Sequence, residues 1–425
     1  MEMTTAGLIA TLSFICALIQ SLNSRRILDL SDKLKERNPV ASRFLHFAGE
    51  PEIAMGMWAA VFLFALMGLW GFEAGLKWMD ERIFSEVIFI FVIMILASSK
   101  PITEFAESII SKISNVIPLP KEMRMYFSIM LLGPLLGSLI TEPAAMTISA
   151  LLLKDAVFKP LKTKINDRFF YTTLAALFVN VSVGGTLTHF AAPPVLMVAR
   201  VWDWDTPYMF MNFGWKALIA VLINTCIATW LNKEALKEIR EPQQQIVAKT
   251  PLWITGVHLV FVVFCILAVH HPAFVVGLFL FFLGFYNITR EAQSEVKIEE
   301  SLLVGFFLGG LLILTAKQGW WLKPILSSVE NLPLYLGTLA LAPVTDNAAI
   351  TSLASQVNNL SELSKYLIVA AAVVGGGMTI IANAPNPAGF TLLREYCPGR
   401  NLKPLKLFLN AFIPTLIAGT IFWFL

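Results

Sequence analysis

Charged residues are scarce in this chain. Only 14% of its 425 residues are Asp, Glu, Lys or Arg, whereas 56% are hydrophobic. A soluble domain carries about 25% charged residues. This shortage, together with many apolar runs of roughly 20 residues, excludes an ordinary soluble domain and predicts an all-α polytopic membrane protein in contact with the lipid bilayer. The basic residues lie in separate loops, so the sequence indicates no nucleic-acid partner.

Cysteine and enzyme motifs are also lacking. The four cysteines are scattered without a Cys-x-x-Cys pair, and His258, His270 and His271 show no metal-ligand spacing with acids. We therefore expect no disulfide framework, no structural metal and no cofactor. The chain contains no His-Glu-x-x-His, Gly-x-Ser-x-Gly or P-loop motif, so no common enzyme class is indicated.

Long apolar runs are the main feature of the sequence. Those without interruption are expected to cross the membrane, and others are interrupted by polar residues, glycine or proline. Together they predict about ten spanning helices plus two re-entrant hairpins. The uninterrupted runs cover about 3–22, 53–76, 84–99, 211–231, 252–270, 272–289, 301–316 and 405–425, and the interrupted ones about 124–153, 169–199, 334–357 and 366–392.

The interrupted runs carry a pair of motifs that occurs twice. Ile-Thr-Glu-Pro-Ala-Ala at 140–145 is matched by Val-Thr-Asp-Asn-Ala-Ala at 344–349. Gly-Gly-Thr-Leu-Thr-His at 184–189 is matched by Gly-Gly-Met-Thr at 376–379, and prolines follow both. Charges and helix breakers at membrane depth are costly, and two such places in corresponding parts of two halves indicate a secondary transporter.

The distribution of Lys and Arg predicts the orientation. Basic residues cluster at 25–43 and at 154–168, so these segments should be cytoplasmic and the N-terminus outside. Because both flanks of 124–153 are basic, we expect this run to enter and leave on the cytoplasmic side. The run 334–357 should then enter and leave on the outer side. The two repeats are therefore expected to have inverted topology, with broken helices in each.

Four regions follow from this topology. They are N-terminal scaffold helices at 1–83, a first inverted repeat at 84–231, a cytoplasmic linker with connecting helices at 232–300, and a second inverted repeat at 301–425.

Glu142 and Asp346 are the primary candidates for ion coupling. A carboxylate in a low-dielectric site can exchange a proton for a cation, and hard cations such as Na⁺ prefer oxygen ligands. Each acid could instead cap a helix or pair with a lysine, and Asp346 in particular could be an N-cap. Further candidates for ion or substrate binding are Thr141, Thr345, Asn347, Thr186, Thr188, Thr379, Asn383 and Asn386.

Other residues near the motifs have two open interpretations. His189 could shuttle protons or be a satisfied buried imidazole. Lys100 and Lys317 could be counter-ions of the acids or snorkel to the interface. The glycines could mark unwound helix or close helix packing; they are Gly184, Gly185, Gly376 and Gly377.

At these repeated elements the chain resembles the ion transporter superfamily, and more narrowly a family described as "putative Na⁺/H⁺ antiporters". The superfamily includes the D-type sodium/proton antiporters, arsenite permeases, and citrate and dicarboxylate carriers. The resemblance spans 84–231 and 301–425 and implies inverted repeats, hairpins, broken helices and a homodimer in the bacterial cytoplasmic (inner) membrane. The carboxylate carriers use Ser-Asn-Thr elements at the hairpin tips, whereas this chain has Thr141-Glu142 and Thr345-Asp346.

The sequence leaves three functions open. The first is an antiporter that exchanges a monovalent cation, above all Na⁺, for H⁺, with small inorganic ions as its partners. The second is a Na⁺- or H⁺-coupled carrier of a small carboxylate or oxyanion, held by half-helix N-termini. The third is an intramembrane enzyme that uses both acids, which would have to lie close enough to share a proton.

Overall fold

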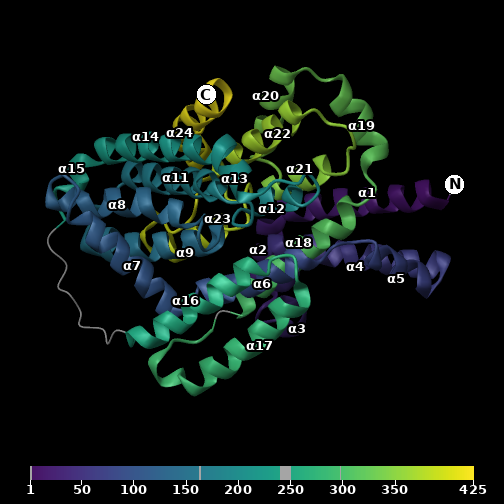
Figure 1. Cartoon of the computed structure of the whole chain (residues 1–425), viewed down its shortest axis with the longest axis horizontal. Coiled ribbons are helices and arrows are strands. Elements are labelled where there is room, and N and C mark those ends of the chain that lie inside the picture. The colour runs from purple at the N-terminus through teal and green to yellow at the C-terminus, as the bar shows by residue number, and fades with distance from the viewer. Residues whose placement is uncertain (1, 162–163, 240–249, 297) are drawn as a thin grey trace.

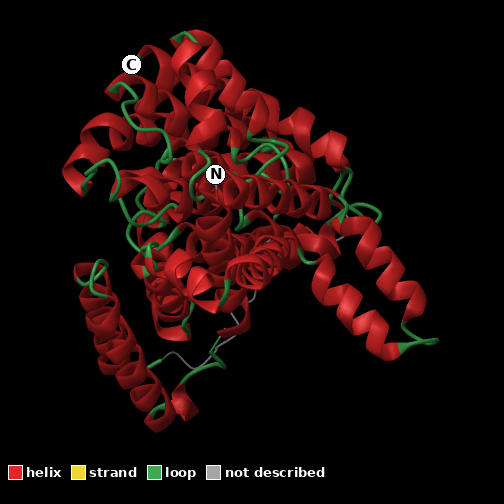
Figure 2. Cartoon of the chain, turned by 90° about the vertical axis from the view of Figure 1, so that its right-hand side faces the viewer, coloured by secondary structure: helices red, strands yellow, loops and turns green. Residues whose placement is uncertain are grey.

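The computed structural model describes residues 2–161, 164–239, 250–296 and 298–425, so parts of the predicted linker at 240–249 and 297 lie outside them. These residues form helices joined by loops, with no strand among them (Figure 2). Six of the described helices are long and apolar enough to cross a membrane, or seven if one bent pair is one span. The prediction of an all-α polytopic membrane protein is confirmed; about ten spans stays a prediction.

The N-terminal helices include a short hairpin, α2 and α3, that joins two longer helices, α1 and α4. Asn38 caps α3 by accepting a hydrogen bond from Ala41 N at 3.1 Å, and Ser31 and Ser42 bond each other's backbone carbonyls. This helical hairpin brings the start of α4 beside the end of α1. The helices are α1 (Glu2–Leu22), α2 (Ser24–Leu34), α3 (Pro39–Gly49), α4 (Pro51–Trp70) and α5 (Phe72–Asp80).

The first half contains a helical hairpin and a broken helix. α8 and α9 pack together around the turn at 137–141, and α11 ends at Gly184 before the chain resumes as α12 at Pro193, a residue that fits the first turn of a helix. The helices are α6 (Ser85–Ala97), α7 (Lys100–Ser114), α8 (Lys121–Leu136), α9 (Glu142–Leu153), α10 (Lys159–Leu161), α11 (Asp167–Gly184), α12 (Pro193–Ala199), α13 (Thr206–Met209), α14 (Trp215–Leu231) and α15 (Lys233–Leu236).

The second half repeats this order. α20 and α21 flank the second turn, and α22 ends at Gly375 before α23 begins at Asn386. The helices are α16 (Leu252–Leu267) and α17 (Pro272–Ile288), which connect the halves, then α18 (Ile298–Thr315), α19 (Gly319–Ser328), α20 (Asn331–Leu341), α21 (Asn347–Ala354), α22 (Glu362–Gly375), α23 (Asn386–Leu393) and α24 (Pro404–Phe424).

The buried apolar side chains form two clusters. The first, which we call the hairpin body, is built mainly from α8, α9, α11, α14, α20 and α22–α24. The second, which we call the N-terminal body, is built mainly from α1, α4, α6 and α16–α18. Figure 1 shows α11, α14 and α24 above α6, α16 and α17. α12 and α21 contribute side chains to both clusters, so they lie where the two bodies meet.

Candidate functional site

Within each half, the hairpin turn is bonded to the loop of its own broken helix. Glu142 N donates to Ala191 O at 3.1 Å, and Asn347 N donates to Ala382 O at 3.0 Å. Between the halves the packing is exchanged, since α9 packs on α23 and α21 packs on α12. The turns and the helix breaks of both halves therefore meet in one region.

A second pair of contacts repeats in the same way. Thr188 Oγ1 donates to Ser138 O, and Thr379 Oγ1 donates to Pro343 O, both at 2.7 Å. Each threonine thus ties the loop of a broken helix to a hairpin turn.

These contacts correct the register in which the sequence motifs were matched. Glu142 is the first residue of α9, and its counterpart at the start of α21 is Asn347 rather than Asp346. Asp346 corresponds to Thr141, because each is the N-cap of its helix. A helix begins directly after its capping residue. The cap is the threonine in the first motif and the acid in the second, so the structural alignment is shifted by one position from the Thr-acid alignment.

The Glu142 carboxylate is completely buried. Its Oε1 accepts a hydrogen bond from Asn383 Nδ2, while Oε2 receives none from any described residue. Asn383 is 1% exposed, and its Oδ1 likewise has no partner within the described chain. A buried, half-satisfied carboxylate is unfavourable, so the arrangement favours binding of a proton or a cation.

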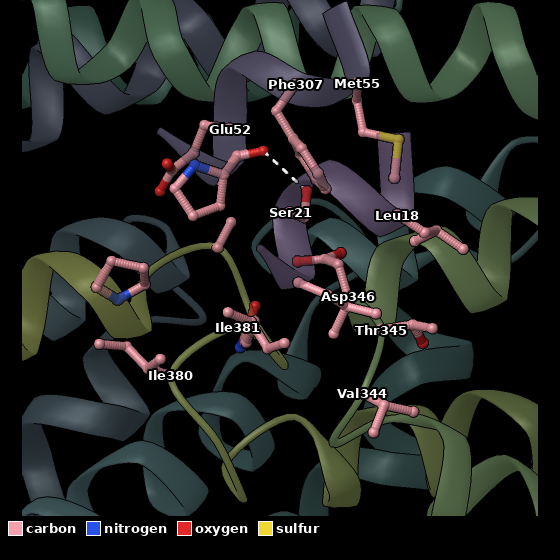
Figure 3. A pocket seen from close by; sticks show the side chains of 15 residues that line it. Leu18, Ser21, Glu52, Met55, Phe307, Val344, Thr345, Asp346, Ile380 and Ile381 are labelled. Atoms are coloured by element: carbon pink, nitrogen blue, oxygen red, sulfur yellow. Dashed lines mark hydrogen bonds between the residues drawn. The ribbon is translucent and has the colours of Figure 1, made fainter. Parts of the chain in front are cut away.

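Asp346 is the N-cap of α21, the role that the sequence left open for it. Its Oδ1 accepts a hydrogen bond from Ala348 N at 2.8 Å, and the residue is 9% exposed. This bond occupies one carboxylate oxygen, and Asp346 also lines a cavity (Figure 3). Its charge acts on that of Glu142, so the two acids are electrostatically linked.

The cavity lies between the hairpin body and the N-terminal body. Its volume is about 40 Å³, and a single water requires about 10–15 Å³, so an ion with a few waters fits. Helices α1, α4 and α18 line one side, and the segments 344–346 and 380–384 line the other. Figure 3 also shows Glu52 at this cavity. Sequence analysis missed Glu52; the available signal was an acid next to a proline at the start of an apolar run.

Ser182 is a second residue that sequence analysis missed. Its Oγ accepts a hydrogen bond from Asn347 Nδ2 at 3.4 Å and donates to Val373 O at 2.7 Å. Ser182 and Val373 each stand two positions before the final glycine of α11 and α22. Corresponding residues of two repeats touch only near the axis that relates them, so Ser182 marks this axis.

The glycines combine both interpretations that the sequence left open. α11 ends at Gly184, and a Cβ there would come within 2.7 Å of Pro134 O. A Cβ at Gly376 would come within 2.5 Å of Ser182 Oγ and would also clash with the Asn347 amide. Gly185 has more room, since a Cβ there would lie 3.3 Å from the Ala192 side chain. Close packing therefore coincides with the helix breaks. Gly377, in the same loop, abuts the backbone of Val179.

The remaining polar candidates are divided between the cavity and the supporting loops. Thr345 lines the cavity and donates to Leu341 O at 3.2 Å. Asn386 Nδ2 donates to two carbonyls of its own loop, those of Gly376 and Thr379. Thr186 bonds the carbonyl three residues before it. Of the predicted ligands, the cavity is lined by Thr345, Asp346 and Asn383. Glu142 does not line it and is connected to it through the hydrogen bond from Asn383, and Thr141 and Asn347 stand at the starts of α9 and α21. Also absent from the lining are Thr186, Thr188, Thr379 and Asn386, which brace the loops instead.

The predicted counter-ions, Lys100 and Lys317, form ion pairs with other carboxylates. Lys100 Nζ is 3.8 Å from Glu104, and Lys317 Nζ is 2.8 Å from Glu81. The structure therefore does not pair either lysine with Glu142 or Asp346, because acids nearer in space hold both ammonium groups. His189 also lies outside the cavity lining. Its Nδ1 is 2.8 Å from Thr206 Oγ1, and its ring lies 6.3 Å from that of His270.

The described residues contain no group of three His, Cys, Asp or Glu side chains that could hold a metal ion. The oxygens gathered at the site belong to carboxylates and amides, which suit a transported monovalent cation better than a tightly held transition metal.

Comparison with known proteins gives one family. The family model described as "Putative Na+/H+ antiporter" matches residues 5–425 of the chain. No curated protein matches the sequence.

Proposed function

Because the chain belongs to the "Putative Na+/H+ antiporter" family, and is thus a multi-pass membrane transporter, we propose that it exchanges Na⁺ for H⁺ by alternating access. Na⁺ and H⁺ are the substrates, and Glu142 and Asp346 carry the coupling.

The observation that supports this most strongly is the half-satisfied carboxylate of Glu142. Asn383 holds one oxygen, and the other is buried without a partner among the described residues. A proton or a Na⁺ ion can satisfy this oxygen, but not both together. Competition of two cations for one carboxylate links their movements, because release of one is needed to bind the other.

Neighbouring groups supply the other oxygen ligands. Asn383 Oδ1 and Asn347 Oδ1 are both buried and lack hydrogen-bond partners within the described part of the chain. Thr345 and Asp346 line the cavity between the two bodies. Threonine hydroxyls, amide carbonyls and carboxylates together form the oxygen-rich environment that a desolvated Na⁺ requires.

The repeated contacts support alternating access. Two halves with the same hairpin, helix break and tie bonds can exchange conformations by a small relative movement, as expected for inverted repeats. The hairpin body and the N-terminal body have separate apolar cores, so each can move as a unit. We place the protein as a homodimer in the bacterial inner membrane, with its basic loops in the cytoplasm and its N-terminus outside.

A carboxylate or oxyanion substrate has less support. The cavity of about 40 Å³ is far smaller than the roughly 300 Å³ or more that organic ligands occupy. Its acidic side chains, Glu52 and Asp346, would also repel an anion.

The test uses purified protein in proteoliposomes that contain a pH-sensitive dye, with an imposed proton gradient. Na⁺, Li⁺, K⁺ and choline are added in turn. A proton flux in response to Na⁺ or Li⁺, absent with choline and absent in Glu142→Gln, supports cation/proton exchange. No response to any cation contradicts it, and the same vesicles would then be screened with carboxylates and oxyanions in Na⁺.

A further inference from the structure

Glu52 stands on the N-terminal body but faces the same cavity as Asp346 (Figure 3). It occupies the first turn of α4, directly after Pro51. Ser21 Oγ of α1 donates to Pro51 O at the start of α4 at 3.4 Å, and Gln20 Nε2 of α1 donates to Ala48 O near the end of α3 at 2.8 Å. The position of Glu52 is therefore fixed by the helical hairpin of α2 and α3.

The surroundings of Glu52 contain few other charges. The titratable groups that act on it are Asp346, across the cavity, and Glu50, on its own chain segment. Helices α1 and α18 contribute Ser21 and apolar side chains to the lining. Among the residues that the structure describes, no Lys, Arg or His lines this cavity, so none of them neutralises from its wall the two carboxylates that face it. Like charges in a partly desolvated space repel, and a cation between them removes the repulsion.

A separate observation points to a bound ligand. The Asn383 side chain lines the same cavity, is 1% exposed, and has an Oδ1 without a partner among the described residues. An amide oxygen buried without a hydrogen bond is costly, and a cation in the cavity would satisfy it. The acids and this oxygen together suit a small, hard, monovalent cation.

We propose that Glu52 is a third carboxylate of the cation site, contributed by the N-terminal body. The proposal rests on the cation exchange proposed above and adds a residue to its site. Glu142 belongs to α9 of the hairpin body, Asp346 caps α21 where the two bodies meet, and Glu52 lies on α4 of the N-terminal body across the cavity from Asp346. The ligand set is therefore complete only in this conformation, and relative movement of the bodies removes Glu52 from the ion. The α2–α3 hairpin joins the ends of α1 and α4 that line the cavity, so we expect Glu52 to serve the exchange of ions with that side.

The first experiment measures equilibrium binding of ²²Na⁺ to the purified full-length protein, together with the protons released on binding. Glu52→Gln should raise the Kd for Na⁺ by roughly tenfold, the effect of losing one charge-assisted contact, and should reduce the protons released. Glu52→Asp retains the charge on a shorter side chain and should give an intermediate Kd. Glu73→Gln, which removes an acid in the first turn of α5 that does not line the cavity, is the control and should bind as wild type.

The second experiment separates a ligand from a structural residue. In proteoliposomes of known orientation, Glu52→Gln should raise the KM for Na⁺ on the side of α2 and α3 and leave the KM on the opposite side unchanged. A wild-type Kd in Glu52→Gln, or an equal rise of KM on both sides, overturns the proposal. If Glu52→Gln does not fold, a wild-type Kd in Glu52→Asp overturns it.

The two proposals fail in different ways. Na⁺ binding that depends on Glu52 but drives no proton flux contradicts the antiporter and leaves the third carboxylate in place. If Na⁺ drives a proton flux but the affinity of Glu52→Gln for Na⁺ equals that of the wild type, the proposal for Glu52 is contradicted and the proposal of antiport stands.

Discussion

Asn383 donates a hydrogen bond to the carboxylate of Glu142 across 241 positions of the sequence. The bond joins the broken helix of the second half to the hairpin of the first. It also leaves one oxygen of each side chain without a partner in the described chain. This single contact links the two halves at the point where the coupled ion is proposed to bind.

Loss of the Asn383 amide should weaken cation binding. In Asn383→Ala, Glu142 keeps its burial but loses its only described side-chain donor, and a hydrogen bond to a charged group contributes about 1.5–3 kcal/mol. The KM for Na⁺ in proteoliposomes should therefore rise by roughly ten- to a hundredfold. Asn410→Ala, which removes an amide whose described hydrogen bond goes to Lys406 O of its own helix, is the control. A wild-type KM in Asn383→Ala would contradict the ligand assignment.

A methyl group at Gly376 should disturb the contact between the halves. The added Cβ clashes with the Asn347 amide and comes within 2.5 Å of Ser182 Oγ. Overpacking of this kind costs about 1–3 kcal/mol, so Gly376→Ala should melt several degrees lower in detergent and transport more slowly. Gly337→Ala, where nothing lies within 4 Å of the new methyl, should behave as wild type. Equal melting temperatures for both variants would show that the axis is not tightly packed.

Lys100 and Lys317 should be dispensable for transport. Glu104 and Glu81 hold their ammonium groups, and partly exposed ion pairs contribute at most about 1 kcal/mol. Lys100→Met and Lys317→Met should therefore keep the KM for Na⁺ within about fivefold. A large rise in KM for either variant would restore the counter-ion role.

The Lys317 pair also predicts a pH dependence of stability. The hydrogen bond from Lys317 lowers the pKa of Glu81, which follows α5 outside the candidate spans. A carboxyl with a lowered folded-state pKa stabilises the fold above its ordinary pKa, and loses this effect as the pH falls through the lowered value. The difference in melting temperature between wild type and Lys317→Met should therefore be present at pH 7 and disappear in acid. A difference that persists at low pH would contradict the ion pair as its cause.

Competition between protons and Na⁺ should set the pH profile of transport. When one proton competes for the site, the apparent KM for Na⁺ rises by up to roughly tenfold for each unit that the pH falls. Exchange should therefore increase with pH until the acids stay deprotonated, and high Na⁺ should shift the profile to lower pH. A KM that does not change with pH would contradict a shared site.

Much of this site was accessible from the sequence because membrane burial makes polar residues conspicuous. Glu142 and Asn383 stand out in apolar runs, and the paired motifs predicted a hairpin turn and a helix break in each half. The exact register was not accessible, since it depends on which residue caps each helix, and Thr141 and Asp346 do so at positions that differ by one.

Long-range partners were the other features hidden from the sequence. Glu52 lies at the edge of an ordinary apolar run, and only the packing of α1 against α4 places it at the cavity. Lys317 was a candidate counter-ion of the acids in the motifs, yet its partner Glu81 is set by the tertiary fold.

The most direct test of the central claim is the initial rate of Na⁺-driven proton flux in proteoliposomes that contain the double variant Glu142→Gln plus Asp346→Asn. The substitutions keep the size of both side chains and remove both charges. If these acids bind Na⁺ and H⁺ in competition, the double variant should reconstitute normally and show no flux above that of empty vesicles. Flux at the wild-type rate would contradict the account.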